Sequence, residues 1–182
     1  MPGAVFLRGD RIVLRTVEDE DVDVLQRARN EPTFRDGLMS KYPANRTMVE
    51  MDLEERAEND DEDTLGALIC VEEEPVGMIH LFDIQPAESG SLGYWLLPEY
   101  RGNGYVTEGA GLLIDHAFQN LALHRILAWA IDYNEASQAV LRRLGFSHEG
   151  THREHVFRNG EYHGIEHYGL LVSEWEGRDM PE

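Results

Sequence analysis

The sequence has almost no cysteine and lacks any long apolar run. Its one cysteine, Cys70, excludes an intramolecular disulfide and a metal site built from several thiolates. The apolar runs fall well short of the roughly 18 residues that a membrane-spanning helix needs. The N-terminus also lacks the basic segment and apolar stretch of a secretory signal. We therefore expect a cytoplasmic protein that does not bind a membrane, with residues 1–182 forming a single domain.

Basic residues are also scarce. The chain has 35 Asp and Glu against 16 Lys and Arg, only Lys41 is a lysine, and the formal net charge is -19. A negative field of this size repels phosphate backbones, so we expect no binding to nucleic acid. Two interpretations of the acidity stay open, which are attraction of a cationic substrate and adaptation to a salty cytosol. The acids are spread along the chain, and this favours salt adaptation.

Hydrophobic periodicity predicts both strands and helices. Apolar runs predict strands over residues 11–14, 65–71, 75–82, 91–97, 125–131, 145–157 and 162–172, the last two joined by an Asn-Gly turn. Apolar residues at helical spacing predict helices over residues 16–29, 48–57, 105–121 and 135–144, and Asn30-Glu31-Pro32 is expected to end the first of them. Several antiparallel strands with helices inserted late imply an α+β fold around a central mixed sheet.

A glycine-rich turn lies between a predicted strand and a predicted helix. It reads Arg101-Gly102-Asn103-Gly104-Tyr105-Val106-Thr107. The glycines let the backbone approach a ligand closely, and the amides at the start of the helix attract an anion such as a phosphate. A nucleotide P-loop requires a Gly-Lys pair, and the sequence has none. A dinucleotide-binding turn would have its third glycine at position 107, which is Thr107 here. Both observations argue against a nucleotide-binding turn. Taken alone, such a turn is more often an ordinary connection.

The turn lies within a set of motifs that resembles the GNAT superfamily of N-acetyltransferases. The pyrophosphate loop of that superfamily reads Arg/Gln-x-x-Gly-x-Gly/Ala, and its key positions here are Arg101, Gly104 and Val106, of which the valine is a departure. The other motifs resemble the branch that acetylates ribosomal-protein N-termini; they are Gly93-Tyr94-Trp95, Pro98-Glu99-Tyr100, Asn134-x-x-Ser137, Leu144-Gly145-Phe146 and Asn159-Gly160-x-Tyr162-His163. The resemblance covers about residues 11–175.

The resemblance implies the GNAT fold, a mostly antiparallel sheet with two splayed strands flanked by helices, and acetyl-CoA as co-substrate. It assigns the pyrophosphate to Arg101–Thr107 and the pantetheine arm to the backbone of Leu96 and Leu97. A backbone N–H in the same strand would polarise the thioester carbonyl. The reacting end falls to Asn134 and Ser137. Asn134 is also a favourable helix N-cap, and the two roles are compatible.

Acyl transfer to an amine needs a proton donor for the leaving thiolate and a base for the amine. Many relatives carry the donor as a tyrosine seven residues after the motif asparagine, and here that position is Leu141. The resemblance implies Ser137 instead, with equal weight for a plain polar residue in the first helical turn. Glu154 and Glu88 are the candidate bases, and an ordered water is the alternative to both.

Histidine contributes two further candidates. His80 and His155 are candidate proton relays, although a lone strand histidine is more often structural. The eight histidines show no metal-ligand spacing, so we expect no metal.

The resemblance implies the α-amine of a protein N-terminus as the acceptor, and a pKa of about 8 makes such an amine easier to deprotonate than lysine. The acceptor groove is expected to be lined by two predicted helices and a turn, at residues 19–29, 48–57 and 159–160. The alternative enzyme is an acetyltransferase for a small amine, such as a polyamine or an aminoglycoside. The alternative from another class is a non-catalytic acyl-CoA sensor. We expect a monomer or a homodimer.

Overall fold

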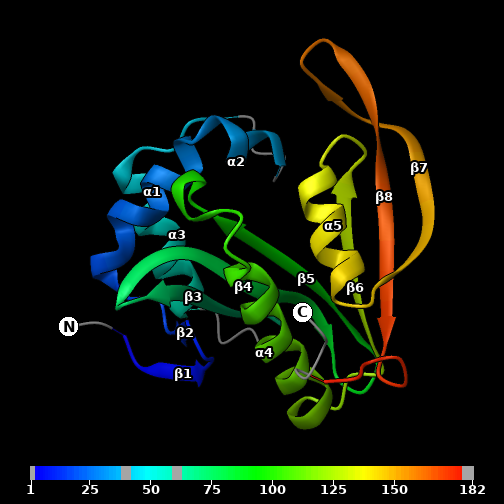
Figure 1. The fold of residues 1–182 in the computed structure, drawn as a ribbon. Helices are drawn as coiled ribbons and strands as arrows, with labels where there is room; N and C mark the ends of the chain where they lie inside the picture. The colour runs from blue at the N-terminus through cyan, green and yellow to red at the C-terminus, as the bar shows by residue number, and fades with distance from the viewer. Residues whose placement is uncertain (1–2, 38–41, 59–62, 178–182) are drawn as a thin grey trace.

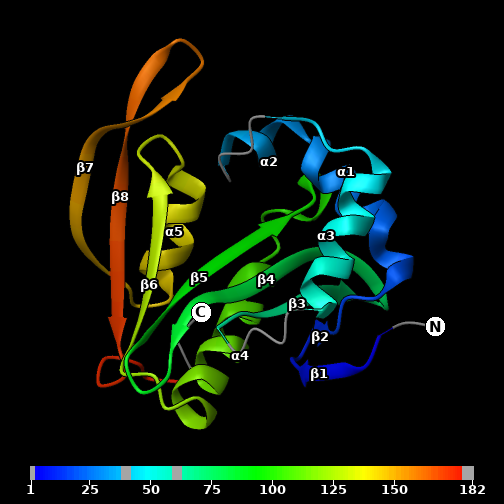
Figure 2. The same ribbon diagram turned by 180° about the vertical axis from the view of Figure 1, so that it is seen from behind.

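The structure is a computed structural model that describes residues 3–37, 42–58 and 63–177. Within these residues an eight-stranded sheet has helices on both faces (Figures 1 and 2). The strands are β1 (Val5–Arg8), β2 (Val13–Arg15), β3 (Leu65–Val71), β4 (Glu74–Gln85), β5 (Ser89–Leu96), β6 (Arg125–Ile131), β7 (Ser147–Arg158) and β8 (Glu161–Leu171). The helices are α1 (Val22–Asn30), α2 (Pro32–Gly37), α3 (Arg46–Glu58), α4 (Tyr105–Asn120) and α5 (Glu135–Arg143), with 3-10 turns η1 (Asp19–Asp21) and η2 (Pro98–Tyr100).

The sheet is antiparallel except at one place. Its strands lie in the order β1-β2-β3-β4-β5-β6-β8-β7, and only β5 and β6 pair in parallel. Parallel neighbours need a crossover connection, and α4 provides it. The predicted α+β class with a mixed, mostly antiparallel sheet is confirmed.

The two parallel strands separate after a short contact. Residues 89–91 of β5 pair with residues 125–127 of β6. Beyond this contact β5 continues along β4 as far as Leu96, and β6 continues along β8 as far as Ile131. The two strands therefore diverge toward their C-terminal ends (Figure 1), which confirms the predicted splay. The facing edges of the two strands leave the ladder there, and their backbone groups need other partners.

Each face of the sheet has its own apolar cluster. On one face α4 and α5 contribute Leu113 and Leu141, which have no exposed surface and pack against the sheet. On the other face Ala28 of α1 and Phe34 of α2 pack around Met78 and Trp95. The gap between β5 and β6 therefore lies between α4 and α5 on one side and the N-terminal helices on the other.

Most predicted elements appear, with two additions. The Asn-Gly turn joins β7 and β8 as expected, with φ of 50° at Asn159 and 90° at Gly160, the left-handed values of a tight hairpin. The additions are β1, which has only four residues, and α2. The sequence placed a stop at Pro32, and α1 does end at Asn30, but a new helix begins at Pro32 because proline suits the first helical position. No described helix is long and apolar enough to cross a membrane.

A buried ion pair holds the start of η1 to β2. Both amino groups of the Arg15 guanidinium donate to the two carboxylate oxygens of Asp21, at 2.8 and 2.7 Å, and the side chains are 8% and 6% exposed. The amide of Glu18 also donates to Asp21 Oδ2 at 2.9 Å. The bond to Asp21 is the main reason that the pKa of Arg15 is raised, so the guanidinium keeps its charge inside the protein.

We expect Asp21→Ala to lower the free energy of unfolding by about 3–5 kcal/mol, because it leaves a charged guanidinium buried without its partner. The control is Glu50→Ala, which removes an exposed ion pair with Arg46 and should cost at most about 0.5 kcal/mol. Urea denaturation measures both losses. Similar losses in the two variants would contradict this account of the buried pair.

Candidate active site

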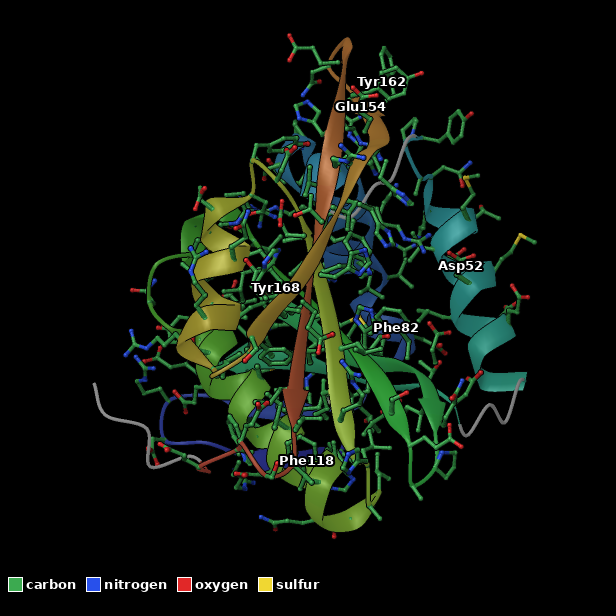
Figure 3. All side chains as sticks on the ribbon, turned by 90° about the vertical axis from the view of Figure 1, so that its right-hand side faces the viewer. Asp52, Phe82, Phe118, Glu154, Tyr162 and Tyr168 are labelled. Atoms are coloured by element: carbon green, nitrogen blue, oxygen red, sulfur yellow. The ribbon has the colours of Figure 1, made fainter. Side chains whose placement is uncertain are left out.

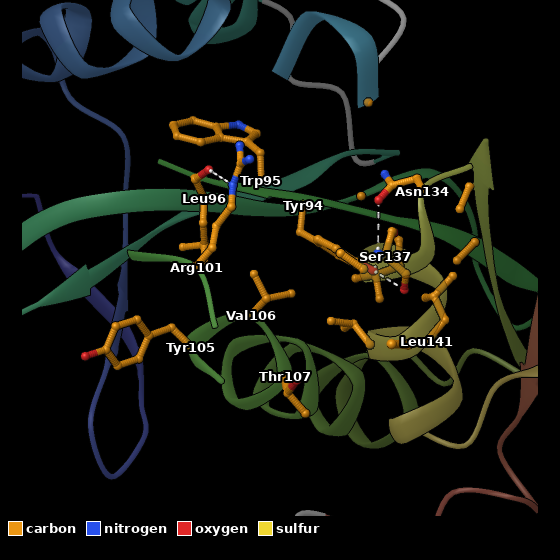
Figure 4. A pocket seen from close by; sticks show the side chains of 18 of the residues that line it. Tyr94, Trp95, Leu96, Arg101, Tyr105, Val106, Thr107, Asn134, Ser137 and Leu141 are labelled. Carbon is orange, nitrogen blue, oxygen red and sulfur yellow. Dashed lines mark hydrogen bonds between the residues drawn. The ribbon is translucent and has the colours of Figure 1, made fainter. Parts of the chain in front are cut away.

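A pocket of about 800 Å³ fills the gap between the splayed strands (Figure 4). Its walls come from β4, β5, β6, the turn before α4, α5 and the short helix α2. Most residues predicted to hold the cofactor line it; they are Leu96, Arg101, Gly102, Gly104, Tyr105, Val106, Thr107, Asn134 and Ser137. The separation of β5 from β6 brings these residues from two distant parts of the sequence to one cavity.

Two residues predicted for the cofactor do not line the pocket. Leu97 is 3% exposed in the cluster under α1, and its amide donates to the carbonyl of Val76 at 2.9 Å. Because bonding directions alternate along a strand, the backbone groups of Leu96 turn the other way, toward the gap. Asn103 donates from its side chain to the carbonyls of Tyr100 and Arg101 at 3.1 and 3.3 Å, and so supports the turn itself.

The turn before α4 presents backbone amides to the pocket. Gly102 and Gly104 both have φ of 79°, which only glycine adopts without strain. Gly104 is the N-cap of α4, and the first bond inside the helix runs from the amide of Glu108 to the carbonyl of Gly104 at 3.0 Å. The amides of residues 105–107 have no intrahelical acceptor and are therefore available to an anion. Val106 is only 8% exposed and packs into the core, so the departure from Gly/Ala leaves its amide in place.

Arg11, between β1 and β2, holds this turn from outside. Its Nη1 donates to the carbonyl of Asn103 at 2.8 Å, and its amide and Nε each donate to the Glu108 carboxylate at 2.9 Å. The guanidinium also lies 5.6 Å from the ring centre of Tyr105. Sequence reasoning did not single out Arg11, because its partner Glu108 is 97 residues away and no local pattern joins them.

The charge of the pocket is opposite to that of the protein. Arg101 and Arg143 line it, whereas none of the described lining residues is Asp or Glu, in a chain of net charge -19. Arg101 donates from Nε to the carbonyl of Leu96 at 3.1 Å, which holds its side chain at the end of β5. The two arginines and the start of α4 together make a region suited to an anionic ligand.

Three polar residues meet on the other side of the gap. Asn134 caps α5, and its Oδ1 accepts the amide of Ser137 at 3.2 Å (Figure 4). The Ser137 hydroxyl lies 2.9 Å from the hydroxyl of Tyr94, which also donates to the Ser137 carbonyl at 3.2 Å. Burial raises the pKa of Tyr94 to about 12, although the bond to Ser137 opposes the shift, so the phenol stays protonated at neutral pH.

Tyr94 is a functional candidate that sequence reasoning missed. The search for a tyrosine stopped at position 141, where Leu141 is fully buried in the core. Tyr94 stands in the Gly93-Tyr94-Trp95 motif, but the motif gives no sign that this side chain crosses from β5 to α5. That contact follows from the splay and from the position of α5.

Neither candidate carboxylate lines the pocket. Glu88 lies in the turn between β4 and β5, where its carbonyl accepts the amides of His124 and Arg125 at 3.0 and 3.1 Å. This is the closed end of the splay. Glu154 is exposed at a bulge in β7, and with Arg153 it lines a separate shallow hollow on the outer hairpin (Figure 3).

Aromatic residues line the side of the pocket nearest the N-terminal helices. Phe34 of α2 packs edge-on against Trp95 of β5, with ring centres 5.5 Å apart. His80 and Phe82 of β4 lie beside each other on the same wall, with ring centres 5.3 Å apart. The sequence predicted that residues 19–29, residues 48–57 and the turn at residues 159–160 would line the acceptor groove. None of them is among the described lining residues, and of the three N-terminal helices only α2 contributes any. Within the described residues, no group of three His, Cys, Asp or Glu is arranged to hold a metal ion.

Several known proteins are similar to this chain. The sequence model of the acetyltransferase (GNAT) domain matches residues 11–147. The putative ribosomal N-acetyltransferase YdaF of Bacillus subtilis is 40% identical over 102 residues, which span 56% of each protein. The probable N-acetyltransferase YjcK of the same organism is 35% identical over 85% of this chain and 91% of its own. Spermidine N(1)-acetyltransferase of Escherichia coli K12 is 30% identical over 83% of this chain and 81% of its own.

Solved structures share the fold. The ribosomal alpha-N-protein acetyltransferase RimL in complex with coenzyme A superposes with a TM-score of 0.84 and 21% identity, over 94% of this chain and 99% of that one. Spermidine N-acetyltransferase from Vibrio cholerae, in complex with coenzyme A and spermine, superposes with a TM-score of 0.84 and 20% identity, over 91% of this chain and 98% of that one. At these identities the likeness concerns the fold alone.

The chain therefore belongs to the GNAT acetyltransferase family and is an acyltransferase. Within the family it is similar in sequence to the putative ribosomal N-acetyltransferase YdaF and in fold to RimL.

The clamp between Arg11 and Glu108 generates a prediction about the turn. Partial burial opposes ionisation of Glu108, but bonds from the amide and guanidinium of Arg11 outweigh it and lower the pKa of this carboxyl. A lowered pKa means that the clamp is complete above the ordinary value of about 4.3 and is lost only as the pH falls through the lowered value. The clamp is therefore intact throughout the neutral range.

We expect Glu108→Gln to weaken coenzyme A binding about fivefold at pH 7.5, because losing the charge-assisted bonds costs about 1 kcal/mol of turn stability. Titration calorimetry with coenzyme A measures the change. The control is Glu176→Gln, an exposed site that alters net charge by the same amount. An equal loss of affinity in both variants would show that long-range charge, rather than the clamp, is responsible.

Proposed function

We propose that the protein transfers acetyl from acetyl-CoA to the α-amine of a protein N-terminus. The observation that carries the coenzyme assignment is the charge of the pocket: Arg101, Arg143 and the amides at the start of α4 line it, and no described carboxylate does. A protein of net charge -19 repels polyanions elsewhere, so a local basic pocket marks where an anionic ligand binds. The diphosphate would lie on Arg101–Thr107, and the pantetheine arm along the open edge of β5 at Leu96.

The groups around the gap suit direct acyl transfer. When bound, acetyl-CoA supplies an activated acetyl thioester. A backbone amide on the open edge of β5, at Tyr94 or Leu96, is placed to donate to the oxygen that becomes negative in the transition state. Ser137 is the proposed proton donor to the leaving sulfur, and the protonated phenol of Tyr94 is hydrogen-bonded to it. Tyr94 thus brings a phenol to the site from β5, where many relatives bring one from the position of Leu141.

The acceptor side of the pocket favours a substrate with one amine. Its described lining residues are aromatic or small, together with His80, and none is acidic. A polyamine carries several ammonium groups, and each would lose its hydration here without a carboxylate partner. An N-terminal α-amine is a single group with a pKa of about 8, so a useful fraction is neutral at physiological pH. The name of YdaF supports the same acceptor class.

Acetylation of a small polycation, such as a polyamine or an aminoglycoside, is the second candidate. Spermidine N(1)-acetyltransferase is 30% identical to this chain over 154 residues. The net charge of -19 would also draw a polycation toward the surface. The absence of carboxylates from the described pocket lining speaks against it.

An acceptor panel tests the function. Thiol release from acetyl-CoA would be measured with peptides that carry a free N-terminus, the same peptides with a blocked N-terminus, spermidine and an aminoglycoside, at low and high KCl. We expect release only with the free N-termini. Release confined to spermidine or the aminoglycoside would establish the second candidate. Tight binding of coenzyme A with no release from any amine would indicate a sensor.

The hydrogen-bonded hydroxyls of Ser137 and Tyr94 lead to a prediction about turnover. We expect Ser137→Ala to lower kcat about 100-fold at saturating acetyl-CoA, and Tyr94→Phe about tenfold, because a positioned acid contributes about that much. Steady-state kinetics with a free-N-terminus peptide measures both, and calorimetry should show coenzyme A affinity within about twofold of the parent. Ser173→Ala, at an exposed serine, is the matched control. Unchanged turnover in Ser137→Ala would exclude the acid role.

A further inference from the structure

We propose that His80 is the base that takes the proton from the acceptor amine. This inference rests on the proposed function and assigns the one role that the geometry above leaves without a residue.

The position of His80 follows from its pairing with a glycine. His80 of β4 lies opposite Gly93 of β5 in the antiparallel register. A side chain at position 93 would place its Cβ 2.6 Å from His80 Nε2 and 2.7 Å from Cε1, closer than real contacts allow. The His80 imidazole therefore lies over Gly93 of β5, one residue before Tyr94, and Nε2 is its atom nearest to the position that a Cβ would take. Glycine is required here for space, and this gives a reason for the first residue of the Gly93-Tyr94-Trp95 motif.

Among the lining residues that the structure describes, no other side chain is suited to act as a base. The remaining ionisable lining side chains are guanidinium and phenol groups, which are side-chain types poorly suited to accept a proton from an amine; they are Arg101, Arg143, Tyr94, Tyr105 and Tyr133. Glu88 and Glu154 lie outside the pocket, at the closed end of the splay and on the outer hairpin. Of the described lining residues, only His80 carries an imidazole, the side-chain type that most often serves as a general base.

The faces of β5 separate the base from the acid. Tyr94 packs with the cluster under α4 and α5, on the side of Ser137. Met78, two residues before His80 on the same face of β4, packs with Trp95 and Phe34 in the cluster under the N-terminal helices. An amine that enters beside α2 meets His80, while the leaving sulfur on the α5 side meets Ser137. The proposed proton acceptor, His80, and the proposed proton donor, Ser137, therefore lie on opposite faces of β5.

The transfer balances with these groups alone. The acceptor ammonium gives its first proton to His80 Nε2, which later releases it to solvent. The neutral nitrogen then forms the C–N bond to the acetyl carbon as the C–S bond breaks and sulfur leaves with the electron pair. The Ser137 hydroxyl gives its proton to the sulfur, and the second amine proton, which is lost as the amide forms, passes through solvent and restores that hydroxyl. The net products are the amide, the free thiol and one proton.

The test is the pH dependence of kcat/KM with a free-N-terminus peptide. We expect the parent to lose rate at acidic pH as its imidazole becomes protonated, and His80→Gln to lose that acidic limb together with about 100-fold of its rate at pH 7.5. Coenzyme A affinity and the circular dichroism spectrum should be unchanged. The matched control is His124→Gln, an exposed histidine outside the pocket, which should keep both the limb and the rate.

Two further variants separate a proton acceptor from a packing residue. His80→Ala should regain activity on addition of imidazole, which a structural role would not allow. Gly93→Ala should lose rate because its methyl group displaces the imidazole. Retention of the acidic limb in His80→Gln, or its loss in Glu154→Gln alone, would overturn the proposal while leaving the acetyltransferase function intact. Absence of turnover in the parent with every amine would overturn both.

Discussion

The short pairing of β5 with β6 is the constraint on which the site depends. The two strands share a ladder only at residues 89–91 and 125–127, and each then follows its other neighbour. The sheet tolerates this separation because β4 and β8 each hold one edge of the diverging strands. The result is an open edge of backbone groups at the mouth of a pocket, with α4 beginning on one side of it and α5 on the other.

The site is built largely from backbone geometry, and its few polar side chains act on that frame. The turn at residues 101–104 is held by Arg11 and by its own Asn103, and the start of α5 is held by Asn134. These hydrogen bonds hold the walls of the pocket in place. The amides that face the cavity therefore keep their orientation for a ligand. The cavity between these walls has a volume of about 800 Å³, which leaves room for an extended ligand.

The distribution of charge gives the pocket its selectivity. Acidic residues cover the chain, but the described pocket lining carries arginine and no carboxylate. Under the proposed function, this basic pocket would attract the anionic coenzyme, and the acceptor amine would meet the aromatic wall beside His80. The spread of acids favours adaptation to a salty cytosol, where dissolved ions would screen the repulsion between surface acids. The pocket lining would still differ in charge from the rest of the chain.

Local patterns in the sequence were enough for most of the strands, the main helices, the hairpin turn and the glycine-rich turn. Each depends on residues within a few positions of one another, as with Gly102 and Gly104 before the apolar spacing of α4. Only the tertiary structure decided which distant side chains share the pocket. It joined Arg11 to Glu108 and Tyr94 to Ser137, and it put Glu88 and Glu154 elsewhere. The physical reason is that contact between strands depends on register and on which face a side chain occupies, and a local sequence pattern specifies neither.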